Sequence, residues 1–365
     1  MLRKGTFILM KTKIQDMTSG SPGRLIILFA IPLMLGNICQ QLYTMVDTMV
    51  VGQVAGVEAL AALGAVDFLM WVVTGISTGL TQGFSIQLSQ YYGAKDFENL
   101  RKSLAHSYRL TAFIAAGVLI LSQSFASLVL TGLHTPSNII GMSLLYLRII
   151  FCGIPATAAY NMFASALRAM GNSKTPLTAM IIASVLNVSL DILFVAGFGW
   201  GVAGAAIATV IAQSFSAVYC FLILRRIDIV HLTRADFMPA SGMNARLMKL
   251  GIPVVFQNII IGVGGLVVQY VINGYGFLFV AGFTATNKLY GLLEMAAISY
   301  GYAIVTYVGQ NLGAGKIDRI RKGVRSSMLL SLLTSLIISA AMFLFGKNIL
   351  SLFISGEPQQ TQQVL

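Results

Sequence analysis

Long apolar windows are the feature that most limits what this chain can fold into. Each runs to roughly 20 residues without the strict alternation of a barrel strand, which indicates helices that cross a membrane. Only 10% of the 365 residues are charged and 56% are hydrophobic, too few charges for a soluble fold to cover such a core. We therefore expect an all-α polytopic membrane protein with nine spans, at 25–51, 60–88, 104–131, 142–166, 177–197, 202–224, 250–272, 277–303 and 326–345.

The basic residues behind the net charge of +12 are distributed according to the predicted topology of these spans. Of the 24 Lys and Arg residues, 20 lie in the N-terminal tail or in alternate connections, after the second, fourth, sixth and eighth spans. The positive-inside rule then places the N-terminus in the cytoplasm. Because the basic residues mark topology, we expect no nucleic-acid partner.

Two stretches of the first part of the chain recur in its second part, at nearly the same offset. Gln90–Lys95 and Gln310–Gly315 share the pattern Gln-x-x-Gly-Ala, and Ala30–Pro32 resembles Gly251–Pro253. Both pairs lie at corresponding places among the spans, which indicates a duplication. An even number of spans precedes the second copy, so the two halves have the same orientation, as in transporters with parallel repeats.

The duplication predicts four regions. They are a cytoplasmic tail (1–24), an N-lobe of six spans (25–224), a cytoplasmic linker (225–249) and a C-lobe of three spans (250–365). Six spans in each half would carry a complete second half to roughly residue 444. We therefore expect a two-lobe transporter of twelve helices, of which about nine are present here.

Ionisable residues inside the spans are candidates for function, because a charge in the bilayer core is costly. At 1.5 Å per residue, Asp47 and Asp191 each lie roughly 8–9 Å from the outer end of their helix. The helices that carry Asp191 and Thr209 are joined by only a few residues, so they pack antiparallel and place Thr209 at the level of Asp191. Asn187 lies one helical turn from Asp191 and shares its face.

These four side chains form a set of hard oxygen ligands suited to Na⁺. An aspartic acid in apolar surroundings can instead carry a proton, so H⁺ is the other candidate coupling ion. The alternative is a polar cluster that only joins helices through hydrogen bonds. We expect no cofactor.

A second group of residues is a candidate lining for a pocket that takes lipophilic cations. It consists of Tyr160, Asn161 and Phe163, with Lys288 and Glu294 from the span 277–303. The alternative for the aromatic members is that they face lipid or pack helices together.

Other classes of membrane protein lack their motifs in this sequence. No H-E-x-x-H is present, which excludes an intramembrane zinc protease of that type, and no nucleotide-binding domain is encoded. An intramembrane aspartyl protease could use Asp47 and Asp191, but the sequence contains no G-x-G-D. We therefore expect a protein that is not an enzyme.

Several motifs together resemble the multidrug and toxic compound extrusion (MATE) family. The resemblance covers essentially the whole chain after residue 17. It rests on Met17–Pro32, Tyr43–Gly52, Ala166–Pro176, Asn187–Asp191, Gly204–Thr209 and Gly309–Ala314.

The resemblance implies an antiporter of the bacterial inner membrane that exports cationic, amphipathic compounds by alternating access, driven by Na⁺ or H⁺. In the family, the acid matching Asp47 and the set matching Asn187, Asp191 and Thr209 form an N-lobe cation site. Some members carry a glutamate where this chain has Ile261, so a C-lobe site of that type is not supported. We expect a monomer whose partners are small organic cations and the bilayer.

The runner-up function is a flippase for a lipid-linked saccharide, from the same broad superfamily. A flippase of this kind should show several buried basic residues for the diphosphate. Within the spans only Arg148 and Lys288 qualify, which argues against it.

Overall fold

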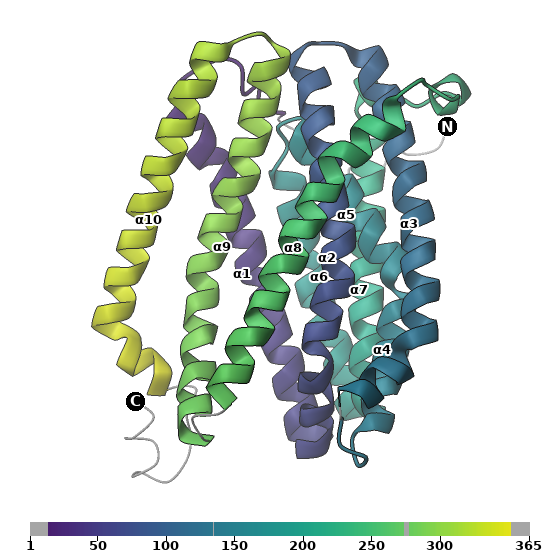
Figure 1. Cartoon of the computed structure of the whole chain (residues 1–365), viewed down its shortest axis with the longest axis vertical. Helices are drawn as coiled ribbons and strands as arrows, with labels where there is room; N and C mark the ends of the chain where they lie inside the picture. The colour runs from purple at the N-terminus through teal and green to yellow at the C-terminus, as the bar shows by residue number, and fades with distance from the viewer. Residues whose placement is uncertain (1–13, 134, 274–276, 352–365) are drawn as a thin grey trace, which may run out of the picture.

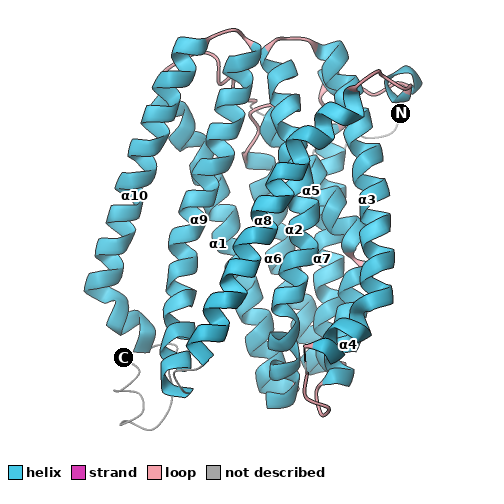
Figure 2. Cartoon of the chain, in the orientation of Figure 1, coloured by secondary structure: helices cyan, strands magenta, loops and turns pink. Residues whose placement is uncertain are grey.

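The helices of a computed structural model overlap the nine ranges expected for spans, and several extend beyond them. The structure describes residues 14–133, 135–273 and 277–351. Figure 2 shows helices joined by short loops, and the described part of the chain has no strand. The elements are α1 (Pro22–Val54), α2 (Val57–Gly93), α3 (Phe97–Gly132), α4 (Ile140–Cys152), α5 (Ile154–Ala169), α6 (Lys174–Asp191), the π-helical turn η1 (Ile192–Gly197), α7 (Gly201–Leu224), the 3₁₀ turns η2 (Asp228–Val230) and η3 (Arg234–Phe237), α8 (Met243–Asn273), α9 (Phe277–Gly313) and α10 (Ile317–Ser351).

Most of these elements are long and apolar enough to cross a bilayer. Among the described residues, six helices pass that test singly, and two bent pairs pass it when each pair is taken as one span. One such pair is α4 and α5, which meet at Gly153 with a bend of 46°. Pro155 stands in the first turn of α5, where its ring is tolerated, so the expected span 142–166 is a broken helix.

The bounds of the helices confirm the internal repeat. Helices α2 and α9 each contain 37 residues, so the same offset in sequence separates their starts and their ends. The start of α10 follows the start of α3 at that same offset, and α8 follows α1 at nearly the same one. The duplication read from short motifs therefore extends to the length and spacing of whole helices.

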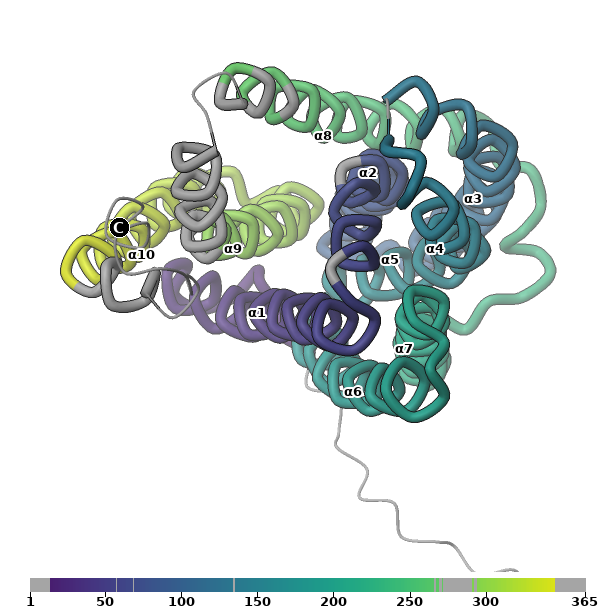
Figure 3. Tube along the Cα trace, turned by 90° about the horizontal axis from the view of Figure 1, so that it is seen from below, coloured from purple at the N-terminus to yellow at the C-terminus, as the bar shows by residue number. Residues whose placement is uncertain are grey.

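Helices α2 to α7 of the first copy form one group, and α9 and α10 of the second copy lie beside it (Figures 1 and 3). Helix α1 lies between α6 and α9, whereas α8 runs diagonally and packs mainly on α2. The copies meet where α2 crosses α8 and where α1 contacts α9, two contacts that the repeat makes equivalent. Glycines allow the close approach of α2 and α8, because a Cβ at Gly83 would overlap the backbone of Gly251.

One end of the bundle, at the top of Figure 1, contains residues 14–21 and the loops 94–96, 170–173 and 314–316. We call it the N-terminal end. Here the segment before α1 lies between the two copies: Gln15 donates its backbone N–H to the carbonyl of Gly171 over 3.2 Å, and Met17 is fully buried. The N–H of Met17 donates to Oε1 of Gln310 over 3.0 Å.

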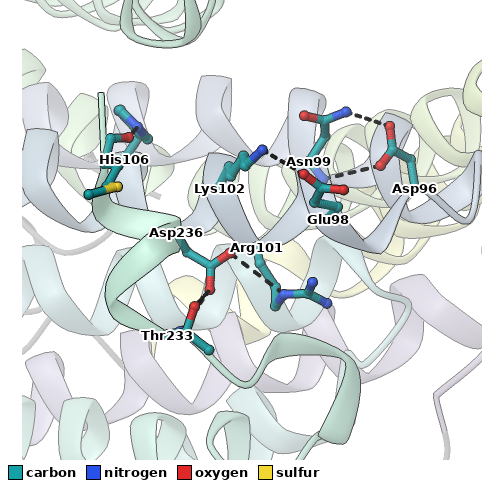
Figure 4. Close-up of polar contacts among 9 residues, drawn as sticks. Asp96, Glu98, Asn99, Arg101, Lys102, His106, Thr233 and Asp236 are labelled. Atoms are coloured by element: carbon teal, nitrogen blue, oxygen red, sulfur yellow. Dashed lines mark hydrogen bonds and ion pairs between the residues drawn. The ribbon is translucent and has the colours of Figure 1, made fainter. Parts of the chain in front are cut away.

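The segment between α7 and α8 is shorter than expected and is held against α3. It ends at Gly242, because α8 begins at Met243 and includes residues 243–249, which the sequence assigns to the linker. Asp236 pairs with Arg101 at 3.7 Å and closes a capping box with Thr233 (Figure 4). His106 of α3 contacts the carbonyl oxygen of Met238 at 3.0 Å.

Candidate functional site

A cavity of about 420 Å³ is lined by α1, α2 and α4 to α7, and α9 reaches it with Tyr302. Helix α1 contributes a polar stripe: Asn37, Gln40, Thr44 and Asp47 follow one another every three or four residues, which places them on one face. The first half of the chain therefore supplies most of the wall, and the second half contributes at the contact between the copies.

The expected ion-site residues converge beside this cavity. Asp47 and Thr209 line it, whereas Asn187 and Asp191 are fully buried behind its wall. Nδ2 of Asn187 donates to Oγ1 of Thr209 over 3.4 Å, which confirms that α6 and α7 place these two residues at one depth. Asp191 lies close enough to Asp47 for the charges to interact.

Four buried acceptor oxygens of this cluster lack a donor among the described residues. Oδ1 of Asp47, Oδ1 of Asn187 and both carboxylate oxygens of Asp191 are buried, and none has a hydrogen-bond partner in the described part of the chain. Buried polar atoms are normally paired, so an unpaired set of acceptors calls for a cation or a proton. The donor set is two carboxylates, an amide and a hydroxyl, and no group of three or more His, Cys, Asp and Glu suited to a metal occurs among the described residues.

A π-helical turn begins directly after Asp191. Residues 192–197 leave the α-helical hydrogen-bond pattern before the short connection to α7. Such turns are uncommon and frequently lie at functional sites. Here the change of helix type occurs at the residue whose two carboxylate oxygens lack a partner within the described ranges.

The candidate pocket residues divide between the cavity and other places. Tyr160 and Asn161 line the cavity, and Nδ2 of Asn161 donates to Oγ1 of Thr78 over 3.3 Å. The expectation for Phe163 is wrong: its side chain packs against Tyr108 and Phe221 at centroid distances of 5.3 and 5.2 Å, away from the cavity.

Of the two charged candidates of α9, only Glu294 has a side chain that the structure describes. Glu294 is exposed and does not line the cavity. The side chain of Lys288 lies outside the described residues. Ile261, which stands where some family members carry a glutamate, is 51% exposed on α8.

Further lining residues were not predicted from the sequence. On α2, Asp67, Trp71, Thr74 and Thr78 line the cavity from one face. Their spacing of three and four residues inside an apolar span was a readable signal. Arg168 also lines the cavity, although its place after the span 142–166 suggested a loop.

Comparisons with known proteins agree on one family. The model of the family described as MatE matches residues 32–193 and 253–361, so it matches both copies of the repeat. The "Probable multidrug resistance protein YpnP" of Bacillus subtilis (strain 168) is 31% identical over 343 residues, which are 94% of this chain and 77% of that protein. The "Probable multidrug resistance protein NorM" of Thermotoga maritima is 26% identical, covering 92% of this chain and 72% of that one.

Solved structures share the fold. A MOP superfamily transporter from Pyrococcus furiosus superposes with a TM-score of 0.90 at 23% identity, covering 97% of this chain and 78% of that chain. A structure described as the outward-facing conformation of a multidrug resistance MATE family transporter gives a TM-score of 0.90 at 23% identity, covering 97% and 79%.

Proposed function

This chain belongs to the MATE family of transporters, and from that premise we propose that it is a secondary active antiporter that exports cationic amphipathic compounds in exchange for Na⁺ or H⁺. One observation carries the proposal. A cluster of buried oxygen atoms without donors in the described part of the chain lies against the wall of a cavity that the first copy of the repeat encloses and that Tyr302 of the second copy reaches. An ion site and a substrate site therefore share Asp47, which belongs to both.

The shared carboxylate supports exchange of one cation for another. Asp47 lines the cavity and also lies near Asp191, so its charge acts on both occupants. A cation or proton bound between the two carboxylates neutralises charge that would otherwise attract a cationic compound in the cavity. Binding at the cluster thus weakens the hold on the exported compound and favours its release.

Alternating access follows from the two-copy architecture. The copies contact each other along α2 and α8 and along α1 and α9, and rocking about these contacts would expose the cavity to either side in turn. The basic loops support a cytoplasmic position for the N-terminal end. The relatives in Bacillus support a bacterial plasma membrane as its place.

A lipid-linked saccharide flippase is less well supported. Arg168 is a basic residue of the cavity wall, but Asp47 and Asp67 line the same cavity. Arg148, one of the two basic residues considered for a diphosphate, is exposed and does not line it. An acidic wall opposes binding of a diphosphate, because like charges repel most strongly where water is excluded.

The test is efflux of a fluorescent organic cation from liposomes that contain the purified protein. A Na⁺ gradient and a pH gradient are imposed separately on the native protein, on Asp191→Asn and on Asp228→Asn, a matched change at an exposed residue outside the spans. We expect one gradient to drive efflux, Asp191→Asn to abolish the response and Asp228→Asn to retain it. Normal transport by Asp191→Asn would make the cluster structural, and no transport by the native protein under either gradient would refute the antiporter.

A further inference from the structure

We propose that Arg168 determines specificity by binding an anionic group of the substrate, so that the cavity accepts amphipathic zwitterions as well as simple cations. The inference rests on the proposed export function and adds a chemical class to it. The group recognised is a carboxylate or a similarly planar oxyanion. The observations are the position of Arg168, its partners, and the distribution of charge along the cavity.

Arg168 lies in the last turn of α5 and lines the part of the cavity that is near the N-terminal end of the bundle. Pro32, which precedes the polar stripe of α1, and Leu177 in the first turns of α6 line the same part of the wall. The side chain is neither exposed to the outside nor fully buried. A guanidinium in this position is accessible from the cavity.

The contacts of Arg168 hold its side chain without neutralising it. Nη2 donates to Oγ of Ser165 over 2.9 Å, and the guanidinium carbon lies 4.7 Å from the ring centroid of Tyr302. No carboxylate within the described ranges forms a salt bridge with it. Guanidinium has five N–H donors, so most of them remain for a ligand.

An arginine inside a membrane protein without an acidic partner requires compensation. Such side chains characteristically face a cavity and take part in binding. The fork of donors matches a carboxylate in a bidentate arrangement, which a lysine cannot reproduce. A substrate carboxylate would supply the charge that the described part of the protein does not.

The cavity is polarised along its length. Its wall on α1 extends from Pro32 to Thr48, about 24 Å of helix. Arg168 lies toward the Pro32 end, and Asp47 lies toward the Thr48 end. Uncharged side chains line the length between them, both polar ones such as Asn37 and Gln40 and larger ones such as Tyr160 and Met180. This sequence of basic, uncharged and acidic surface fits an elongated molecule with an anionic and a cationic end.

The contact with Tyr302 links this recognition to the two copies of the repeat. Arg168 belongs to the first copy and Tyr302 to α9 of the second. An anion bound to the guanidinium of Arg168 competes with the ring of Tyr302 for the positive charge of that guanidinium. Substrate bound at Arg168 therefore acts directly on one of the contacts that join the copies.

The experiment compares two fluorescent probes that differ in one group, a rhodamine with a free carboxylate and its methyl ester. Both carry the cationic ring system, but only the first is a zwitterion. Transport in liposomes is measured for the native protein, Arg168→Gln, Arg168→Lys and the control Arg148→Gln, an exposed arginine outside the cavity. Thermal stabilisation of each variant by each probe gives a second readout that does not depend on turnover.

We expect Arg168→Gln to raise KM for the zwitterion about tenfold or more, because a hydrogen bond to a charged group is lost, and to leave KM for the ester within about twofold. Arg168→Lys should lie between, and Arg148→Gln should match the native protein. Equal effects on both probes, or no effect on either, would overturn the role of Arg168. If Arg168→Gln fails to fold, the same comparison of KM and thermal stabilisation with Arg168→Lys decides. A native protein that exports the ester but not the zwitterion overturns this inference alone, whereas export of neither probe removes the proposed function.

Discussion

Gly93 of α2 packs against the backbone of Gln310 of α9, and Gly313 of α9 packs in the same way against the backbone of Gln90 of α2. A Cβ at either glycine would overlap the carbonyl oxygen of the opposite glutamine. The two motifs that revealed the duplication are thus the surfaces through which the copies touch at the N-terminal end. Each glycine is needed because its partner's backbone occupies the space of a side chain.

Replacing one of these glycines should separate the copies. In Gly313→Ala the methyl group cannot be accommodated by a rotamer change, because the obstacle is backbone, so α9 must move away from α2. We expect the distance between spin labels at Lys95 and Lys316 to increase. We also expect transport to slow by about tenfold or more, because the state in which the copies close the N-terminal end is destabilised by roughly 1–3 kcal/mol. Gly301→Ala, at a position with open space around it, is the control. An unchanged label distance in Gly313→Ala would contradict the close contact.

The side chain of Gln310 should be important for closing the N-terminal end. Its Oε1 accepts from the N–H of Met17, and its Nε2 donates to the carbonyl of Ala169 over 2.8 Å, so one buried amide joins the N-terminal segment, α5 and α9. Gln310→Ala leaves two buried backbone groups unpaired, at about 1–3 kcal/mol each. We expect a lower unfolding temperature in detergent and faster labelling of a cysteine placed at Met17. The exposed Gln53→Ala should change neither; equal behaviour of the two variants would count against the role of Gln310.

Some features of this molecule are readable from the sequence because they depend on neighbours along the chain. The spans follow from apolar length, and the pair Asn187 and Asp191 follows from helical spacing. Thr209 follows from the short connection between two helices. The structure confirms these three relationships, although the binding role of the residues stays a prediction.

Other features depend on which helices meet, and no local pattern contains that information. Phe163 packs against α3 and α7 and does not line the cavity. An aromatic residue in an apolar helix gives the same sequence pattern whether it packs helices together or lines a cavity. Arg168 meets Tyr302 only because the two copies come together. The linker is held on α3 by Arg101 and Asp236, a pair distant in sequence.

Asp236 should make the packing of the linker against α3 dependent on pH. Burial acts to raise the pKa of this carboxyl, but the hydrogen bonds from Thr233 and the charges of Arg101 and Lys102 outweigh it, so the pKa lies below its ordinary value. The folded protein therefore binds this proton less tightly than the unfolded chain. The contribution to stability is complete above the ordinary pKa near 3.9 and is lost as pH falls through the lowered pKa.

The variant that tests this is Asp236→Asn, measured by thermal unfolding in detergent at several pH values. At pH 7 we expect it to be less stable than the native protein by about 1–2 kcal/mol, from weaker hydrogen bonds to Thr233. The difference should shrink below about pH 4 as the native carboxyl is protonated. Asp228→Asn, at an exposed carboxyl of the same linker, should show no such difference. A gap that stayed constant down to pH 3 would exclude the charge of Asp236 as its cause.

Thr209→Val tests the ion cluster without altering its charge. The substitution keeps the shape of the side chain but removes the hydroxyl that accepts from Asn187 and that would ligate a cation. A ligand that binds only the folded state raises its stability in proportion to the logarithm of the ligand concentration over Kd. If Na⁺ is the coupling ion, it should raise the unfolding temperature of the native protein above that in choline at equal ionic strength. Thr209→Val should then require about tenfold more Na⁺ for the same rise, and Asp191→Asn should show none.

The control for this series is Thr178→Val, a partly exposed threonine near the other end of α6, which should respond to Na⁺ as the native protein does. Stabilisation by Na⁺ that survives unchanged in both Thr209→Val and Asp191→Asn would place the ion elsewhere. If Na⁺ does not stabilise even the native protein, while a pH gradient drives efflux that Asp191→Asn abolishes, the cluster instead carries a proton. A proton needs a carboxylate to accept it but no set of surrounding ligands, so Thr209→Val should then transport nearly as well as the native protein. The two coupling ions are therefore distinguished by whether the hydroxyl or only the carboxylate is required.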